Sequence, residues 1–416
     1  MPTADGVLLL GWEYPPEMSG GLGVVTDQLL RALLLQGVPM TLLLPDYIAR
    51  RVVLAPENAL LPLLDGDTPP LETLRVSTTL FSPYLTPAEY RHRLRRTGSL
   101  PRNVYGENLY AEIDRYTAEA LTKLAHRQFC LVHAQDWITG TVALEIKQRY
   151  GTPYLMHVHL TSYDMHPGHF SRSGEVYERE YRSMHGADRL LAVSQYTRQV
   201  LMDHYDVPAE KITVVHNAYN DRSPEGELDY EKVWPKDQGQ FWVLFIGRFT
   251  YHKGIATLLD TAQRCIAANP QMHFFLAGGQ GELEDHVRYS VSTPPLRDNV
   301  HYLGFINRPV RDALYTRADA MLIPSVSEPF GLIALEAVMH HTPLVVSSTC
   351  GATELITHKL SADWWDSALF AEHLLNLAAY PALRRTLREK ALQSLPTLSW
   401  DTQASLVRQL YSPYLS

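Results

Sequence analysis

The sequence predicts an α/β protein built from two doubly wound, Rossmann-like domains that face each other across a cleft. Its 416 residues suit two domains of roughly 200 residues each, both large enough to bury a core. Short apolar runs alternate with segments of helical spacing, which is typical of parallel sheets covered by helices. A polar, turn-rich stretch at residues 217–240 interrupts this alternation, which then restarts.

The first half of the chain carries the first series of elements. Strands are predicted at residues 7–11, 40–44, 131–134, 154–158, 190–193 and 212–215, with helices from about residue 22, at 139–150 and from about residue 195. Residues 60–102 are rich in proline and show no clean period. We interpret them as an insertion near the acceptor side of the cleft.

The second half repeats the pattern. Strands are predicted at residues 242–246, 274–277, 301–303, 320–323 and 344–346, with helices from about residue 255, near 282–289, and from about residues 310 and 332. We therefore assign residues 1–220 to an N-terminal domain and residues 221–399 to a C-terminal domain. The helix predicted within residues 400–416 is expected to pack back on the first domain. Ligands of such sheets bind beyond the carboxyl ends of the strands, so the cleft is the expected site.

Composition narrows the possible partners. Apolar residues make up 45% of the chain and charged residues 20%, as in ordinary globular proteins, and a net charge of -8 argues against a nucleic-acid partner. No run approaches the about 18 apolar residues of a membrane span, and the first residues lack the pattern of a signal peptide. We expect a cytoplasmic protein with at most peripheral membrane contact, although the basic run at residues 91–96 is better explained as a solvated face.

Two glutamates around the start of a predicted helix give the strongest functional signal. Glu328 follows the strand predicted to end near residue 324, and Glu336 lies inside the helix that begins near Gly331. The helix start would aim the backbone N–H groups of Phe330, Gly331 and Leu332 into the cleft, where a diphosphate fits without a metal. Glu336 could accept the hydroxyls of a ribose, and Glu328 could meet a sugar ring. The alternative is a capping carboxylate followed by a surface glutamate.

Two basic residues follow the first strand of the second domain. Arg248 and Lys253 lie in the loop after the strand predicted at residues 242–246. A guanidinium and an ammonium group there could neutralise two phosphates while the bond to them breaks. Isolated basic residues are more often solvated surface charges, but the position after a strand and before Gly254 favours the functional interpretation.

A glycine-rich turn joins the first predicted strand to the first predicted helix. Gly20 and Gly21 would let the backbone approach a phosphate or a sugar closely. Dinucleotide binding is the competing interpretation. Its fingerprint needs a third glycine, and here Gly23 is followed by Val24, Val25 and Thr26. We therefore disfavour a nicotinamide cofactor.

Polar residues at strand ends of the first domain complete the candidate site. Asp136 and His159 could hold sugar hydroxyls from this side of the cleft, whereas His133 and His157 are equally well explained as structural. The histidines at positions 157, 159, 166 and 169 do not have the spacing of a zinc site. Cys130, Cys265 and Cys350 likewise indicate neither a disulfide framework nor a metal site. We expect no metal and no resident cofactor.

These motifs resemble one family. The segments at residues 12–23, 133–137, 186–197, 214–218, 247–254 and 327–337 are similar to those of retaining glycosyltransferases of the glycogen synthase and mannosyltransferase type, which are family 4-like and have the GT-B fold. The resemblance covers almost the whole chain. Its two most specific parts are the Arg248 to Lys253 segment and the two-glutamate segment.

The resemblance implies a role for each candidate residue. Arg248 and Lys253 would hold the diphosphate of a nucleotide sugar, Glu336 its ribose, and Glu328 with the following amides its sugar. Gly20 and Gly21 would face the phosphates, and His159 and Asp136 would lie beside the reacting carbon. The acceptor hydroxyl would attack from the face that the nucleotide leaves, so that the anomeric configuration is retained without a metal.

Two positions depart from the family pattern. Starch and bacterial glycogen synthases of this group carry a lysine where this chain has Met18, which puts ADP-glucose and glucan elongation in doubt. The usual Asn-Gly-Val-Asp of the interdomain turn is Asn-Ala-Tyr-Asn at residues 217–220. Neither departure affects the diphosphate residues.

The sequence therefore predicts a hexosyltransferase. We expect it to move a hexose, with glucose first, from a UDP-, ADP- or GDP-sugar to an acceptor hydroxyl on a glycan or small molecule. Two alternatives stay open at this point: a nucleotide-sugar epimerase of the same fold, and a non-catalytic protein that binds nucleotide sugars. Intact Arg248, Lys253, Glu328 and Glu336 argue against the second, because a decayed site should lose a charged member.

Overall fold

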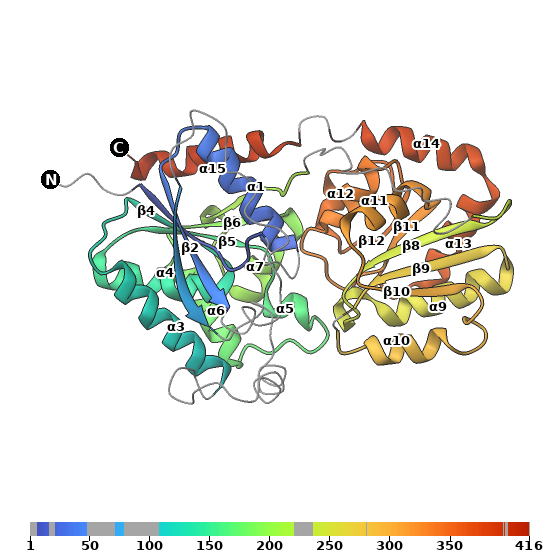
Figure 1. The fold of residues 1–416 in the computed structure, drawn as a ribbon, viewed down its shortest axis with the longest axis horizontal. Helices are drawn as coiled ribbons and strands as arrows, with labels where there is room; N and C mark the ends of the chain where they lie inside the picture. The colour runs from blue at the N-terminus through green and yellow to red at the C-terminus, as the bar shows by residue number, and fades with distance from the viewer. Residues whose placement is uncertain are drawn as a thin grey trace.

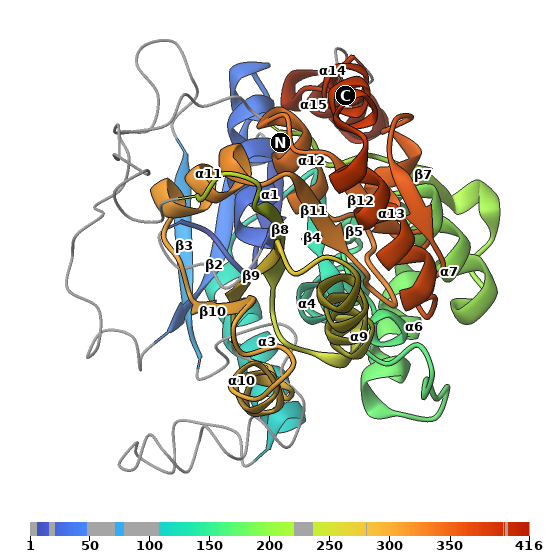
Figure 2. The same ribbon diagram turned by 90° about the vertical axis from the view of Figure 1, so that its right-hand side faces the viewer.

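The central strands carry apolar side chains on both of their faces, so the sheets are buried on both sides. In strand β8 (Phe241–Gly247), Phe241, Val243 and Phe245 enter one apolar cluster, and Trp242 and Leu244 enter another. Successive side chains of a strand point to opposite faces, so both faces of this sheet need a covering layer of helices. The helices on either side of the sheet supply it (Figure 2).

The computed structural model describes residues 6–15, 21–47, 71–78, 108–219, 236–279, 281–393, 395 and 398–415. Met18, Gly20, the basic run at residues 91–96 and the expected domain boundary near residue 220 lie outside these ranges.

The first sheet has seven parallel strands in the order β3-β2-β1-β4-β5-β6-β7. They are β1 (Val7–Leu10), β2 (Met40–Tyr47), β3 (Glu72–Thr78), β4 (Leu131–Gln135), β5 (Tyr154–Val158), β6 (Arg189–Ala192) and β7 (Ile212–Val214). The accompanying helices are α1 (Gly21–Leu35), α3 (Leu109–Leu124), α4 (Asp136–Tyr150), α5 (Ser162–Met165), α6 (Glu175–Gly186), α7 (Gln195–Tyr205) and the short η2 (Ala209–Lys211).

The second sheet has six parallel strands in the order β10-β9-β8-β11-β12-β13. Besides β8 they are β9 (Met272–Gly278), β10 (Val300–Gly304), β11 (Ala320–Ile323), β12 (Leu344–Ser347) and β13 (Leu360–Ala362). Its helices are η3 (Tyr251–Lys253), α9 (Ile255–Ala268), α10 (Glu284–Val291), α11 (Arg308–Arg317), α12 (Leu332–Met339), η4 (Gly351–Glu354), α13 (Ser367–Ala379) and α14 (Pro381–Leu392). The predicted fold class of two parallel, doubly wound sheets is confirmed.

Several elements of the first domain were not predicted from the sequence, namely β3, α3, α5 and α6. Part of the expected insertion at residues 60–102 forms β3, which pairs in parallel with β2 at the edge of the sheet. Only Val76 and Thr78 of this strand are buried, so its sequence shows little apolar alternation. Helix α3 was not predicted. Asn108 caps it by accepting from the N–H groups of Tyr110 and Ala111, both at 3.0 Å.

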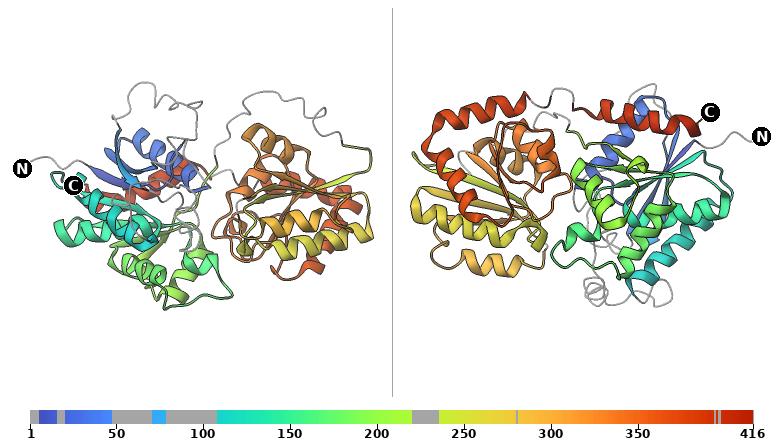
Figure 3. Two further views of the ribbon diagram at one scale, coloured as in Figure 1. Left: turned by 60° about the horizontal axis from the view of Figure 1, so that its bottom comes forward. Right: turned by 180° about the vertical axis from the view of Figure 1, so that it is seen from behind.

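The last helix, α15 (Trp400–Tyr411), lies on the first domain although it follows α14 of the second (Figure 3). Trp400, Val407 and Tyr411 are buried in the same apolar cluster as Val7 and Leu9 of β1. The chain thus crosses between the domains twice. None of the helices in the described ranges is long and apolar enough to span a membrane.

The two domains meet through loops at the carboxyl ends of their strands (Figure 1). Ser194, directly after the β6 region, donates through Oγ to the carbonyl of Pro329 at 2.5 Å. The carboxylate of Glu354 accepts from the N–H of Gln195 at 3.0 Å. The loops at the carboxyl ends of the two sheets, where the sequence predicts the ligand site, are therefore in direct contact.

Candidate active site

Lys253 and Glu328 form the centre of the site. The ammonium nitrogen of Lys253 lies 2.6 Å from Oε2 of Glu328, which also accepts from the hydroxyl of Ser325 at 3.2 Å. The two loops can approach because Gly254 has a φ of 71° and no side chain. A Cβ at that position would lie 1.9 Å from the carbonyl oxygen of Pro324. The sequence predicted both residues for one site but not this ion pair, which brings the loops after β8 and β11 into direct contact.

Arg248 lies in the same positive region. Burial, together with the charges of Lys253, Arg248 and His166, lowers the pKa of His252 to about 2. All three groups are therefore near the His252 ring, which stays neutral. His166 comes from the first domain, directly after α5, and α5 packs against η3. The basic loop after β8 consequently faces the other domain.

The start of helix α12 offers unused backbone donors. Gly331, the residue before the helix, has a φ of 89° that favours glycine. In the part of the chain that the structure describes, no group accepts from the N–H of Phe330, Gly331 or Leu332. These N–H groups and the positive end of the helix suit an anion beside Glu328.

Glu336 has partners that the sequence did not reveal. Its Oε2 accepts from the hydroxyl of Tyr315 at 2.9 Å, and its Oε1 lies 3.5 Å from Nη1 of Arg311. Both partners come from α11. The buried Nε of Arg311 has no hydrogen-bond partner among the described residues. Arg311 and Tyr315 are four residues apart, which places them on one face of a helix, but nothing in the sequence indicated that this face contacts Glu336.

One of the two glycines predicted to face the phosphates lies against the start of helix α12. Gly21 begins α1, and a Cβ added to it would lie 3.1 Å from the Leu332 side chain. This places the start of α1 against the start of α12. Gly20, its neighbour, lies outside the described residues.

Asp136 supports the loop that carries His159. The Asp136 carboxylate is 1% exposed and accepts from the backbone N–H of His159 at 2.6 Å and of Leu160 at 3.3 Å. Asp136 itself has a φ of 58°, at the first position of α4. Both residues lie at the carboxyl ends of strands as expected, and their contact with a sugar stays a prediction. In this structure Asp136 orients the backbone of His159.

Behind His159 lies a buried row of rings. His159 and His157 have ring centroids 4.3 Å apart, His157 and His133 5.6 Å, and Nδ1 of His133 is 2.5 Å from the Tyr411 hydroxyl. Burial lowers the pKa of His133 to about 4 and that of His159 to about 3, so the row is neutral at physiological pH. His133 and His157 are therefore best explained as core residues.

The described residues contain no group of three or more His, Cys, Asp or Glu side chains placed to hold a metal ion.

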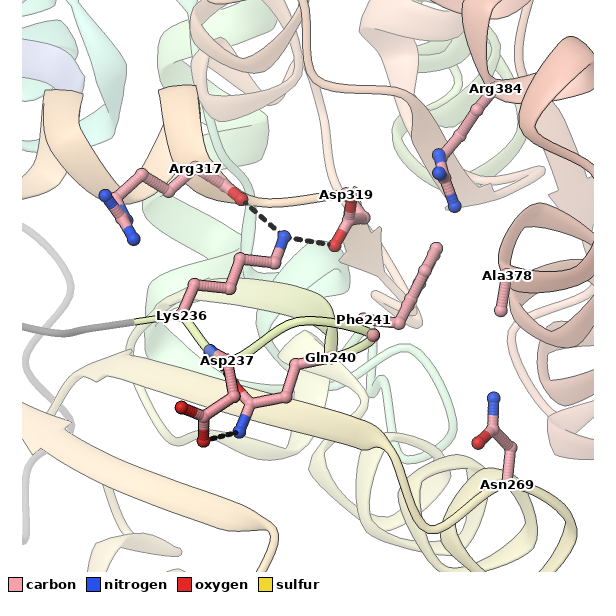
Figure 4. A pocket seen from close by; sticks show the side chains of 10 residues that line it. Lys236, Asp237, Gln240, Phe241, Asn269, Arg317, Asp319, Ala378 and Arg384 are labelled. Atoms are coloured by element: carbon pink, nitrogen blue, oxygen red, sulfur yellow. Dashed lines mark hydrogen bonds and ion pairs between the residues drawn. The ribbon is translucent and has the colours of Figure 1, made fainter. Parts of the chain in front are cut away.

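A separate hollow lies at the amino ends of β8 and β11, away from the cleft (Figure 4). There Lys236 donates to Oδ2 of Asp319 at 2.5 Å and to the carbonyl of Arg317 at 3.2 Å. The same carboxylate oxygen accepts from the N–H of Trp242 at 2.9 Å. These bonds fix the start of β8, so we assign the Lys236 and Asp319 contact a structural role.

Comparisons with known proteins agree with this architecture. Residues 19–222 match the family model described as Glycosyltransferase Family 4, and residues 227–393 match the model described as Glycosyl transferases group 1. An uncharacterized glycosyltransferase of Methanocaldococcus jannaschii is 25% identical, covering 86% of this chain and 84% of its own. The glycogen synthase of Mycobacterium tuberculosis is 25% identical, with 97% and 94% covered. A D-inositol 3-phosphate glycosyltransferase of Salinispora arenicola is 26% identical, with 73% and 74% covered.

Solved structures show the same fold. Sucrose-phosphate synthase from Thermosynechococcus elongatus superposes with a TM-score of 0.74 at 21% identity, covering 98% of both chains. Anabaena HepE in complex with UDP and glucose superposes with a TM-score of 0.72 at 17% identity, covering 98% of this chain and 100% of its own. The two family models together span most of the chain, and the expected resemblance is confirmed. The chain belongs to the glycosyltransferases of the GT-B fold that combine a family 4-like domain with a group 1 domain.

Proposed function

We propose that the protein is a retaining, metal-independent glycosyltransferase that moves a hexose, with glucose as the first candidate, from a nucleoside-diphosphate sugar to an acceptor hydroxyl. The observation that carries this proposal is the pairing of Lys253 with Glu328 at 2.6 Å beside the start of α12. A cation for the leaving diphosphate and a carboxylate for the donor sugar then share one site at the cleft.

Similar proteins support the class of donor. Anabaena HepE was solved in complex with UDP-glucose, and the catalytic domain of starch synthase IV from Arabidopsis thaliana was solved with ADP and acarbose. Because these neighbours differ in the base, the donor of this chain has to be sought among UDP-, ADP- and GDP-sugars.

The proposed reaction balances without a further reactant. The bond between the anomeric carbon and the diphosphate oxygen breaks, and the acceptor oxygen bonds to that carbon on the same face. The acceptor proton passes to an oxygen of the departing diphosphate. Arg248 and Lys253 would stabilise the charge on the diphosphate, with help from the N–H groups at residues 330–332. Glu336, oriented by Tyr315, would hold the ribose.

A donor panel tests the proposal. UDP-, ADP- and GDP-hexoses are incubated with the protein in EDTA, the released nucleotide is quantified, and the anomer of the released sugar is identified by NMR. We expect one donor to be hydrolysed slowly with retention, at the same rate with and without EDTA. Release of the inverted anomer, or loss of turnover in EDTA, would contradict the proposal.

The panel also separates the epimerase alternative. An epimerase would change the sugar while it remains attached to the nucleotide, so the recovered nucleotide sugar is identified as well. We expect the unreacted donor to be recovered unchanged.

A further inference from the structure

A buried line of hydrogen bonds crosses between the domains next to Glu328. Ser327 of the second domain places its Oγ 2.7 Å from Oδ1 of Asp164 in α5 and 2.8 Å from the hydroxyl of Tyr196 in α7. Ser327 is 0% exposed and Asp164 is 1% exposed. Asp164 and Tyr196 of the first domain therefore contact the residue that directly precedes Glu328 in the sequence.

The direction of these bonds follows from the number of hydrogens. The second oxygen of Asp164 accepts from the N–H of Thr161 at 2.8 Å and from its hydroxyl at 2.7 Å, so the carboxylate acts as an acceptor on both sides. Ser327 has one hydroxyl hydrogen and donates it to Asp164. The hydroxyl of Tyr196 must then donate to Ser327.

The residue after Glu328 is also held by the first domain. The carbonyl of Pro329 accepts from Ser194 Oγ at 2.5 Å and from Thr197 Oγ1 at 3.3 Å. Gly351 leaves the space for this contact, because a Cβ there would lie 2.1 Å from the same carbonyl oxygen. Both neighbours of Glu328 are thus anchored across the cleft.

Packing between two domains does not by itself require a buried carboxylate such as that of Asp164. A buried carboxylate such as Asp164 is costly unless donors satisfy it. Thr161, from the same domain, satisfies one oxygen, and Ser327, from the other domain, satisfies the second. Opening the domains would give that oxygen to water and release the 327–329 segment.

We propose that Asp164, Tyr196 and Ser194 are positioning residues that act through residues 327–329 to fix Glu328 when the cleft closes. This inference rests on the proposed function, in which Glu328 contacts the donor sugar. In the proposed function the nucleotide is held by Arg248, Lys253, Glu336 and the N–H groups at residues 330–332, all of the second domain, and its binding would not need these contacts with the first domain. Sugar transfer would need them.

The Ser327→Ala variant tests the proposal. Loss of the hydroxyl removes the link between Tyr196 and Asp164, and we expect kcat to fall about 10-fold or more because a hydrogen bond to a charged group is lost. The dissociation constant for UDP, measured by calorimetry, should stay within about 2-fold. Ser183→Ala is the matched control, since Ser183 is also buried but its Oγ makes no hydrogen bond within the described residues.

A double variant distinguishes a linked chain from independent contacts. Tyr196→Phe alone should lower kcat by less than Ser327→Ala, because the Ser327 bond to Asp164 remains. Adding Tyr196→Phe to Ser327→Ala should cause little further loss. Losses that multiply, an unchanged kcat in Ser327→Ala, or a loss of UDP affinity equal to the loss of kcat would each overturn the proposal.

Closure is measured independently of turnover. The radius of gyration of the UDP-bound protein, from small-angle scattering, should be larger for Ser327→Ala than for the wild type and for Ser183→Ala. A wild type that hydrolyses no donor of the panel would contradict the proposed function, whereas equal radii in the three proteins would contradict the positioning role. The two failures are therefore distinguishable.

Discussion

Lys253 and Glu328 hold opposite charges 2.6 Å apart, and their side chains are only 17% and 10% exposed. Removing one partner of such a pair leaves the other charge poorly compensated. A bound diphosphate would give Lys253 a second anion, and Glu328 would then be available to the donor sugar. The pair is therefore suited to exchange partners when a donor binds.

We predict that Lys253→Ala reduces sugar transfer by about 100-fold or more, the loss usual when a group that stabilises transition-state charge is removed. Turnover of the donor identified in the panel is measured for both proteins. Lys390→Ala, an exposed lysine on α14, is the control and should leave turnover unchanged. A wild-type rate in a folded Lys253→Ala protein would remove Lys253 from the mechanism.

The candidate site was only partly predictable from the sequence. Lys253, Glu328 and Glu336 were predicted as candidates because they lie in loops after strands or in the first turns of the helix that follows. Arg311 was missed, although it lies 3.5 Å from Glu336. The hydrogen bond of Ser327 to Asp164 was missed because it joins residues 163 positions apart in different domains. Such contacts depend on how helices and domains pack, which local spacing does not determine.

Helix α5 depends on one buried acid. Glu180 of α6 is 1% exposed and accepts from the N–H of Ser162 at 2.8 Å, from the Ser162 hydroxyl at 2.5 Å and from the Tyr205 hydroxyl at 2.6 Å. Burial raises the pKa of Glu180 to about 7, against the hydrogen bonds, which lower it. The acid thus anchors the start of the element that carries Asp164.

We predict a pH-dependent stability difference between the wild type and Glu180→Gln. A carboxyl whose pKa is raised on folding stabilises the fold fully below its unfolded pKa and loses that contribution as pH rises through the folded value. The glutamine carries no charge, so the variant should gain on the wild type between about pH 5 and pH 8. The gain is at most about 3–4 kcal/mol, because the pKa rises from 4.5 to about 7 and each pKa unit corresponds to 1.36 kcal/mol. Urea unfolding at several pH values measures it.

The measured quantity must be the difference in unfolding free energy between the two proteins. The buried histidines change the stability of each protein with pH in the opposite direction to Glu180. Burial lowers the pKa of His133 and His159, so their contribution is lost as pH falls below about 6.5. These terms are common to both proteins and cancel. Glu178→Gln, on the exposed side of the same helix, removes the same charge and should give a flat difference. A flat difference for Glu180→Gln as well would show that Glu180 is not the titrating group.

Strands were predictable where most of their residues are apolar and buried. The apolar cores of β1, β5 and β8 were located because nearly every residue in them is buried. Strand β3 was missed because an edge strand with an exposed face lacks that signal.

At the scale of the molecule, α15 joins the end of the chain to its beginning. Gln36, after α1, donates through Nε2 to the carbonyl of Asp401 at 2.9 Å, and Trp400 is 3% exposed in the cluster that contains β1. The first domain is therefore incomplete without residues that follow the second.

This arrangement predicts that Trp400→Ala destabilises the first domain although Trp400 follows the second in sequence. Deleting a buried tryptophan side chain usually costs about 3–5 kcal/mol, and hydrogen exchange should rise in α1 and β1 but not in β8. Trp365→Ala is the matched control, because Trp365 is 62% exposed and its loss should cost no more than about 0.5 kcal/mol. Faster exchange in β8 with α1 unchanged would mean that α15 stabilises the domain it follows rather than the one on which it lies.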